Sequence, residues 1–124
     1  MRARFVLSAF PIFVFATPAF AQSSPFGVWT RPSTGTTVEF YDCSAKLCAK
    51  VKSVKDPAQR EGVGKVIMTG AVKAGDNQWK GDLLNLEDGQ TYSGVVTLEG
   101  PKALNLKGCV LGGLVCKGET WTRN

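Results

Sequence analysis

Four cysteines carry the most evident chemistry in this sequence, and they form two close pairs. Four thiolates can hold a zinc ion, but four residues separate Cys43 from Cys48 and six separate Cys109 from Cys116, which is looser than a metal knuckle. A redox pair needs two intervening residues, which neither pair has. Two disulfides are therefore expected in an oxidising compartment, and no metal site is expected.

Four cysteines allow three disulfide connectivities, and the sequence alone leaves them open. We favour the local pairs Cys43–Cys48 and Cys109–Cys116, because each brackets a short turn and can clamp two neighbouring strand ends. Loop entropy does not decide the question, since each small ring contributes about 2 kcal/mol and a bridge between the two regions about 4 kcal/mol.

The sequence offers few groups for catalysis, because it contains no histidine. Ser-His-Asp and Cys-His arrangements are excluded, and the commonest general base is missing. Glu39 and Glu119 could form a carboxylate pair if their strands approach, but a charge on a half-exposed strand is usually solvated. Ser44 and Lys46 lack the spacing of a Ser-Lys hydrolase. The chain is expected not to be an enzyme and to need no cofactor.

The N-terminal segment has the pattern of a signal peptide. Arg2 and Arg4 give a positive start, residues 5–15 form a mainly apolar run, and residues 19–21 have the Ala-x-Ala form that signal peptidase accepts. The run is shorter than the roughly 20 residues of a membrane-spanning helix. Cleavage is predicted after Ala21. Residues 22–124 are then one domain in the periplasm or outside the cell, exported by a Gram-negative-type route, with no transmembrane segment.

The charge of the predicted domain argues against nucleic acid as a partner. Without residues 1–21 the chain keeps 13 Lys and Arg residues against 10 Asp and Glu residues, a net charge of +3. These charges are spread along the chain and form no basic stripe with interleaved aromatic residues. The small excess permits an acidic envelope protein or an anionic cell-wall polymer as a partner.

Beyond the N-terminal segment the chain alternates short strand patterns with turn residues and has no run of helical period. In one pattern Val38 and Phe40 alternate with Glu39, which predicts a buried face and a solvated face. Turn signals such as Gly100-Pro101 separate the strands. Residues 55–64 are expected to be a lid, a short helical turn or a solvated connector. Residues 111–114 could line an opening or form a tight turn, and we favour the turn. The expected strands cover residues 28–31, 36–42, 47–54, 65–69, 78–84, 91–98, 103–110 and 119–123.

The tripeptide Trp-Thr-Arg occurs near both ends of the predicted domain, as residues 29–31 and 121–123. A meander of antiparallel strands can close into a barrel by pairing its first strand with its last, which removes exposed edges. In such a barrel the guanidinium of Arg123 can stack on the indole of Trp29. We therefore predict an all-β, small antiparallel up-and-down barrel of about eight strands, with structural roles for Trp29, Trp121 and Arg123.

Several stretches match a known pattern: GVWTR from Gly27, VEFYDCSAKLCAKV from Val38, W-x-G from Trp79, DGQTYSGVVTLEG from Asp88, and GCVLGGLVCKGETWTR from Gly108. Together they cover nearly all of the predicted domain and closely resemble the bacterial exported family known as domain of unknown function 2147. The family has no assigned function. The Gly27-x-Trp29 start and the terminal Arg123 are also similar to the signature of lipocalins and other calycin barrels. That resemblance implies the same closed barrel.

A barrel of this size can bind one small ligand or be filled by its own side chains. Our leading hypothesis is a monomeric, non-catalytic binding protein for a small apolar or amphipathic ligand. The alternative is a filled-core envelope interaction module that binds a protein or a cell-wall partner through its loops. The predicted cavity lining is Val38, Phe40, Trp79, Leu83, Tyr92, Val96 and Leu106.

Overall fold

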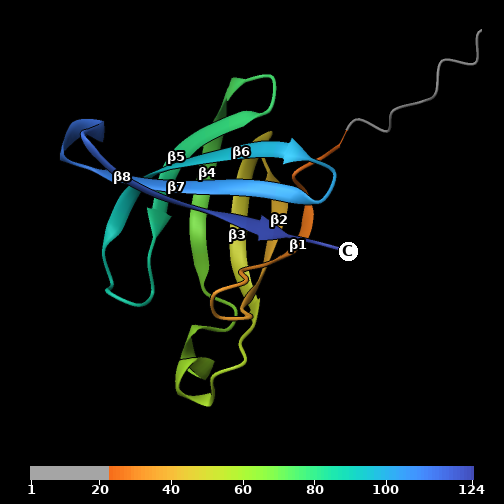
Figure 1. Ribbon diagram of the computed structural model, residues 1–124, viewed down its shortest axis with the longest axis vertical. Helices are drawn as coiled ribbons and strands as arrows, with labels where there is room; N and C mark the ends of the chain where they lie inside the picture. Colours follow the sequence, from red (N-terminus) through yellow and green to blue (C-terminus); the bar gives the residue numbers. More distant parts are fainter. Residues whose placement is uncertain (1–22) are drawn as a thin grey trace, which may run out of the picture.

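The chain forms a closed antiparallel barrel in which each strand pairs with the next and the last pairs with the first. Figure 1 shows this computed structural model, which describes residues 23–124, so the predicted signal peptide lies outside the described residues. The prediction of an eight-stranded up-and-down barrel is confirmed. The elements are β1 (Gly27–Thr30), β2 (Thr37–Cys43), β3 (Lys46–Ser53), η1 (Pro57–Gly62), β4 (Val66–Gly75), β5 (Gln78–Leu84), β6 (Thr91–Gly100), β7 (Ala103–Val110), η2 (Leu111–Gly113) and β8 (Val115–Thr122).

Alternation of apolar and polar side chains sets the two faces of the strands. On β2, Val38 and Phe40 are almost fully buried inside the barrel. Glu39 between them faces outward, where its carboxylate lies 3.8 Å from Nζ of Lys50 and 3.7 Å from Nζ of Lys52 on β3. The period of two therefore places the apolar half of each strand in the core and the charged half in solvent.

Three strands are longer than the sequence predicts, and one of them, β6, runs on only to Gly100 instead of ending at residue 98. β4 continues past the expected end at residue 69 through Gly70 to Gly75, and β8 begins at Val115 instead of residue 119. Gly70 has a φ of 122° and coincides with a shift of register, so β4 bulges there and stays paired. The early start of β8 follows from the pairing of Cys116 with Cys109, which holds β8 against β7.

One half of the barrel is filled by its own side chains. Trp29, Phe40, Val96 and Leu104 from four different strands are buried to within about one per cent of their surface. The ring of Phe40 meets the ring of Trp121 edge-on, with centroids 6.2 Å apart and an interplanar angle of 68°. We call this half, which contains the start of β1, the closed end.

Three glycines face inward side by side on β5, β6 and β7, since Gly81 pairs with Gly94 and Gly94 pairs with Gly108. A Cβ at Gly81 would lie 2.7 Å from Cα of Ala71, and one at Gly94 would lie 2.9 Å from Cβ of Leu83. Only glycine permits this close approach. Figure 1 shows that β6, β7 and β8 run across the direction of β3 and β4, so the sheet is strongly coiled. The three glycines, here called the glycine row, permit this coiling, because they let neighbouring parts of the sheet approach closely.

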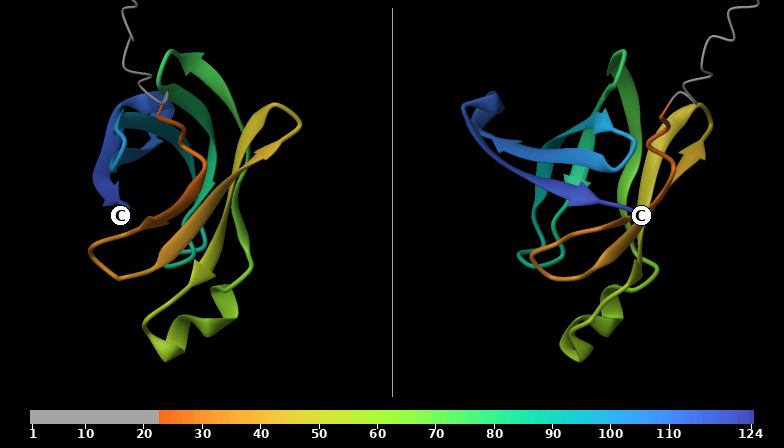
Figure 2. Two further views of the ribbon diagram at one scale, coloured as in Figure 1. Left: turned by 90° about the vertical axis from the view of Figure 1, so that its right-hand side faces the viewer. Right: turned by 45° about the vertical axis from the view of Figure 1, so that its right-hand side comes forward.

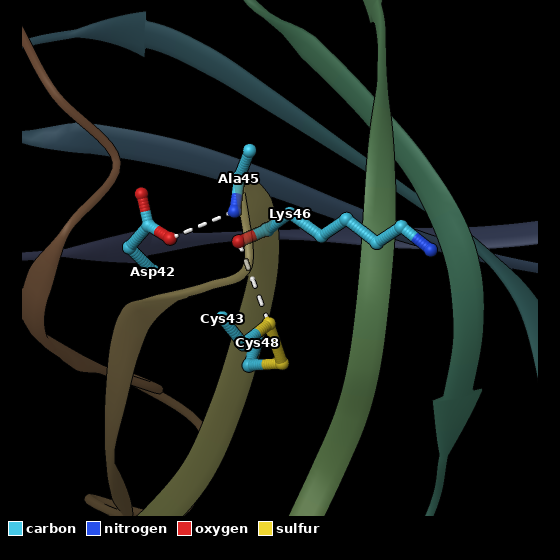
Figure 3. Close-up of a disulfide and its surroundings, with 5 residues drawn as sticks. All are labelled: Asp42, Cys43, Ala45, Lys46 and Cys48. Atoms are coloured by element: carbon cyan, nitrogen blue, oxygen red, sulfur yellow. Dashed lines mark hydrogen bonds between the residues drawn. A yellow bond between two sulfur atoms is a disulfide. The ribbon is translucent and has the colours of Figure 1, made fainter.

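Each disulfide closes one hairpin, and both are the local pairs that the spacing favours. Cys43–Cys48 links β2 to β3, and Cys109–Cys116 links β7 to β8. Figure 3 shows the first of them beside Asp42, whose Oδ1 accepts a hydrogen bond of 3.0 Å from the backbone N–H of Ala45.

These two rings hold strained turns. Within residues 23–124, the non-glycine residues with positive φ are Ser44 (57°), Ala45 (64°) and Leu111 (54°), and all three lie inside a disulfide ring. The left-handed conformation costs about 1–2 kcal/mol for a residue with a Cβ. Asn-Gly is the usual solution for a two-residue hairpin turn of this kind, and Ser44-Ala45 replaces it here. The covalent rings stabilise turns that these residues do not favour by themselves.

The barrel closes along a short seam between β1 and β8, where Thr30 and Thr122 form the single paired position. Just beyond it, the guanidinium carbon of Arg123 lies 4.1 Å from the centroid of the Trp29 ring. The same guanidinium donates hydrogen bonds of 2.7–2.9 Å to the carbonyl oxygens of Ser24, Phe26 and Pro101. One side chain thus joins the N-terminal segment, the β6–β7 turn and β8.

Trp29 needs this cover because it is fully buried. Its Nε1–H donates to the carbonyl oxygen of Pro25 at 2.8 Å, so the indole carries no unsatisfied donor into the core. The planar guanidinium can stack on the ring and still donate in its own plane, which an ammonium group cannot do.

Replacing Arg123 by alanine is expected to lower the free energy of unfolding by about 2 kcal/mol, because one stacking contact and three hydrogen bonds are lost together. Arg123→Lys should recover only part of the loss. Urea denaturation measures both variants. The matched control is Arg60→Ala on η1, an exposed site whose loss should cost less than about 0.5 kcal/mol. Equal stabilities of the Arg123→Ala and Arg60→Ala variants would contradict the role assigned to the seam.

Candidate functional site

The end of the barrel opposite the closed end holds a half-open cavity of about 710 Å³, which we call the cup. The β1–β2 loop, the η1 segment, the β5–β6 loop and β8 contribute to its lining. Small-molecule sites typically measure about 300–1,000 Å³, so the cup has room for one small ligand.

The η1 segment forms one side of the mouth of the cup. The sequence predicts a lid, a short helical turn or a connector over residues 55–64, and the structure has a 3-10 helix there. Its first turn is capped by Asp56, whose carboxylate accepts a hydrogen bond of 2.9 Å from the N–H of Ala58. Figure 2 shows η1 standing clear of the strands beyond the ends of β3 and β4, and Gln59 and Glu61 belong to the lining of the cup.

The seven residues predicted to line a cavity separate into two groups. Val38, Leu83, Tyr92 and Leu106 line the cup, and of these Val38 and Leu106 also belong to the hydrophobic core, against which Leu83 packs. Phe40 and Val96 lie in the hydrophobic core, and Trp79 packs against that core. The prediction treats the interior as one space, whereas the large aromatic side chains divide it into a solid half and a hollow half.

Charged side chains at the mouth form an ion-paired group of Arg31, Glu87 and Glu119, here called the rim cluster. Nε of Arg31 donates to Oε1 of Glu119, and its Nη2 lies 3.4 Å from Oε2 of the same carboxylate. Nη1 of Arg31 donates to Oε1 of Glu87 at 2.8 Å. Oε1 of Glu119 also accepts a hydrogen bond of 2.7 Å from Nε1 of Trp121. The rim cluster therefore links the end of β1 to the β5–β6 loop and to β8.

Burial and neighbouring carboxylates have opposite effects on the pKa of Arg31. Burial alone lowers the pKa of its guanidinium, but the hydrogen bond and the negative charge of Glu119, followed by those of Glu87, outweigh it and raise the pKa above its ordinary value. Arg31 is therefore a permanent cation whose charge is already compensated, and the rim cluster presents one more carboxylate than guanidinium.

A second polar contact lies at the rim, where the hydroxyl of Tyr92 donates to Oδ2 of Asp88. This hydrogen bond stabilises the neutral phenol and the ionised carboxylate together. It raises the pKa of Tyr92 and lowers the pKa of Asp88. The aromatic ring of Tyr92 lines the cup, so the contact ties the β5–β6 loop to the apolar wall.

Sequence reasoning misses the rim cluster, although a signal for it is present. Glu119 is interpreted there as a solvated charge, yet its carboxylate is half-buried against Arg31 and Trp121. Arg31 is two residues after the buried Trp29, and Glu119 is two residues before the buried Trp121. Because side chains alternate along a strand, each charge must share the inward face of its tryptophan. Glu39, the other carboxylate of the hypothetical pair, lies on the outer face with Lys50 and Lys52.

The closed eight-stranded meander defines the class of fold: a lipocalin-like barrel. A solved structure of similar fold bears this out, namely the protein HP1028 of the human pathogen Helicobacter pylori, which is described as belonging to the lipocalin family. The TM-score is 0.59 and the sequence identity 21%, over 78% of this chain and 80% of that chain. More particularly, this chain belongs to the family of uncharacterized proteins conserved in bacteria called domain of unknown function 2147, whose model matches residues 27–123.

Other comparisons add little about function. No curated protein matches the chain. Among residues 23–124, no helix is long and apolar enough to cross a membrane. The two disulfides fit an exported protein, because such bonds persist in oxidising compartments.

A double-mutant cycle of Arg31→Met and Glu119→Gln is expected to give a coupling energy of about 1 kcal/mol at low salt, reduced because both side chains are partly exposed. The coupling should fall as salt is raised, since screening weakens a half-exposed ion pair. Urea denaturation measures the cycle. The more exposed pair Arg31 and Glu87 is the control and should couple less. No coupling between Arg31 and Glu119 at low salt would show that the rim cluster does not form in solution.

Asp88→Asn is expected to move the pKa of Tyr92 down toward the ordinary value of about 10, because the acceptor carboxylate is lost. The chain has two tyrosines, so ultraviolet titration in a Tyr41→Phe background reports on Tyr92 alone. The raised pKa means that the contact stabilises the fold fully below about pH 10 and ceases to do so as pH rises through the folded value. The lowered pKa of Asp88 means that the contact also weakens as pH falls through the folded value of that carboxyl. An unchanged titration after Asp88→Asn would rule the hydrogen bond out.

Proposed function

We propose that this protein is an exported, non-catalytic binding protein that holds one small amphipathic ligand in the cup. The observation that carries the proposal is the division of the barrel, filled by aromatic side chains at one end and hollow at the other. A protein that needed only a stable barrel could fill both halves, because small barrels are readily packed by their own side chains. The two disulfides support export, and the periplasm is the compartment that we propose.

The chemistry of the lining supports an amphipathic ligand. The lining of the cup includes the apolar side chains of Val38, Leu83 and Leu106, which suit a hydrocarbon group. The rim is charged with both signs, including Lys65, Lys117 and the rim cluster. A ligand with an apolar body and a polar head matches this arrangement, with its head at the mouth.

The absence of histidine from the sequence supports a non-catalytic role. The inward carboxylate of Glu119 is occupied by Arg31 and by Trp121, so it is poorly placed to accept a proton from a substrate. Binding without reaction is therefore the simplest use of the cup, and we favour it over the filled-core interaction module.

Native mass spectrometry of protein purified gently from the periplasm tests the proposal, and the expected result is an additional small-molecule mass on the chain. A fluorescent fatty acid should bind the delipidated protein. Leu83→Trp extends an indole into the cup and is expected to lower that affinity at least tenfold, while the loss of stability stays below about 3 kcal/mol because part of the ring enters open space. Val72→Trp, on an exposed position of β4, is the matched control. A clean unliganded mass together with no fatty-acid binding would overturn the proposal.

A further inference from the structure

The hairpin between β7 and β8 ends in an exposed apolar tip. The side chains of Leu111, Leu114 and Val115, called here the hairpin tip, are 72%, 87% and 54% exposed. Figure 1 shows this hairpin, in dark blue, projecting beyond the neighbouring strands, and Figure 2 shows the same projection from another side. Other exposed large apolar residues, such as Phe26 and Val72, lie on separate elements.

The hairpin tip is held in a fixed shape. The ring closed by Cys109–Cys116 contains the whole tip, and the N–H of Leu114 donates to the carbonyl oxygen of Leu111 at 3.3 Å. Leu111 adopts a φ of 54°, which a β-carbon disfavours. Strain of this kind persists where the surrounding structure imposes it, and here it presents a leucine to solvent. Because the hairpin tip is already held in this shape, it loses little conformational freedom when it docks onto a surface.

The charged residues nearest to the hairpin tip along the chain are both lysines. No charged residue occurs from Gly108 to Cys116, and the charges on either side are Lys107 on β7 and Lys117 on β8, both exposed. The first acidic residue along β8 is Glu119, which is engaged by Arg31. Across the sheet, Asp82 on β5 pairs with Ser93 on β6, which in turn pairs with Cys109 on β7. This carboxylate is therefore two strands away from the hairpin.

We propose that the hairpin tip docks the barrel onto the surface of an anionic lipid bilayer. The leucines would enter the boundary between head groups and acyl chains, as the apolar residues of interfacial segments do. Lys107 and Lys117 would then lie at the level of the head groups, where each lysine is attracted by the negative surface potential. Such binding requires an apolar segment that enters the bilayer and cationic side chains next to it, and the hairpin tip and the two lysines supply these.

A protein partner fits the hairpin tip less well than a bilayer does. A stable protein interface buries about 800 Å² on each partner, and three aliphatic side chains on a narrow hairpin fall far short of that area. A bilayer needs no complementary shape, and its contact with the tip is extended by the long-range attraction of the lysines.

The position of the hairpin relates docking to the cup. Gly108 and Lys117, at the base of the same hairpin, line the cup, so the tip is a continuation of the wall beyond the rim. Docking through the tip brings the mouth toward the bilayer, where amphipathic molecules reside. The relation between docking and the cup rests on the proposed function, whereas docking of the hairpin tip does not.

Co-flotation of the exported protein with vesicles tests the inference. Wild-type protein is expected to float with phosphatidylglycerol–phosphatidylethanolamine vesicles and not with phosphatidylcholine vesicles. The variant Leu111→Asn, Leu114→Gln should lower the partition coefficient at least tenfold. Asparagine tolerates the left-handed conformation better than leucine, so this variant should fold at least as well as wild type. Lys107→Gln should lower partition about fivefold, the effect of one surface lysine.

The control variants are Val72→Gln and Lys73→Gln, two exposed positions on β4, and neither should change flotation. Equal flotation of the tip variant and wild type, or no flotation of wild type with anionic vesicles, would overturn the inference. So would light scattering that shows a dimer for wild type and a monomer for the tip variant, because the tip would then serve self-association. The cup is tested separately by its ligand mass, so a liganded protein that ignores vesicles refutes docking alone, and a docking protein that carries no ligand refutes the cup alone.

Discussion

The stacking of Arg123 on Trp29 is the contact on which the barrel depends. The sheet closes at a seam with a single paired position, which is too short to hold β1 and β8 together by backbone hydrogen bonds alone. Arg123 compensates by bonding to three carbonyl oxygens from two other segments while it covers the largest buried side chain. Side-chain contacts thus take the place of the backbone hydrogen bonds that a longer pairing of β1 with β8 would form.

This closure explains why the two ends of the barrel differ. With Trp29 covered and Phe40 packed against Trp121, the closed end supplies a continuous hydrophobic core. The inner wall of the cup shares residues such as Val38 and Leu106 with that core, and beyond them the other end can remain hollow. Its loops are held instead by polar contacts, chiefly the rim cluster and the hydrogen bond between Tyr92 and Asp88. Loops held by such contacts are more easily displaced than packed strands, which suits an entrance.

Much of the fold can be predicted from the sequence, because alternation and turn residues are local signals. The eight strands, their antiparallel order and the meeting of the two Trp-Thr-Arg tripeptides all follow from such signals. The bulge at Gly70 does not, since a glycine in a strand signals a break as readily as a bulge. The rim cluster joins residues up to 88 positions apart, and the depth of the cup depends on where large side chains stop. Both are set by the packing of the whole barrel, which no local pattern encodes.

The glycine row has a consequence for how relatives of this protein could diverge. At Gly81 and Gly94 the space that a side chain would need is already occupied by Ala71 and Leu83, so this part of the wall cannot be altered by single substitutions. The mouth, in contrast, consists of connecting segments that tolerate insertions and deletions. Selection for a longer or bulkier guest would therefore act on loop length, and descendants would keep the same wall with deeper or shallower entrances.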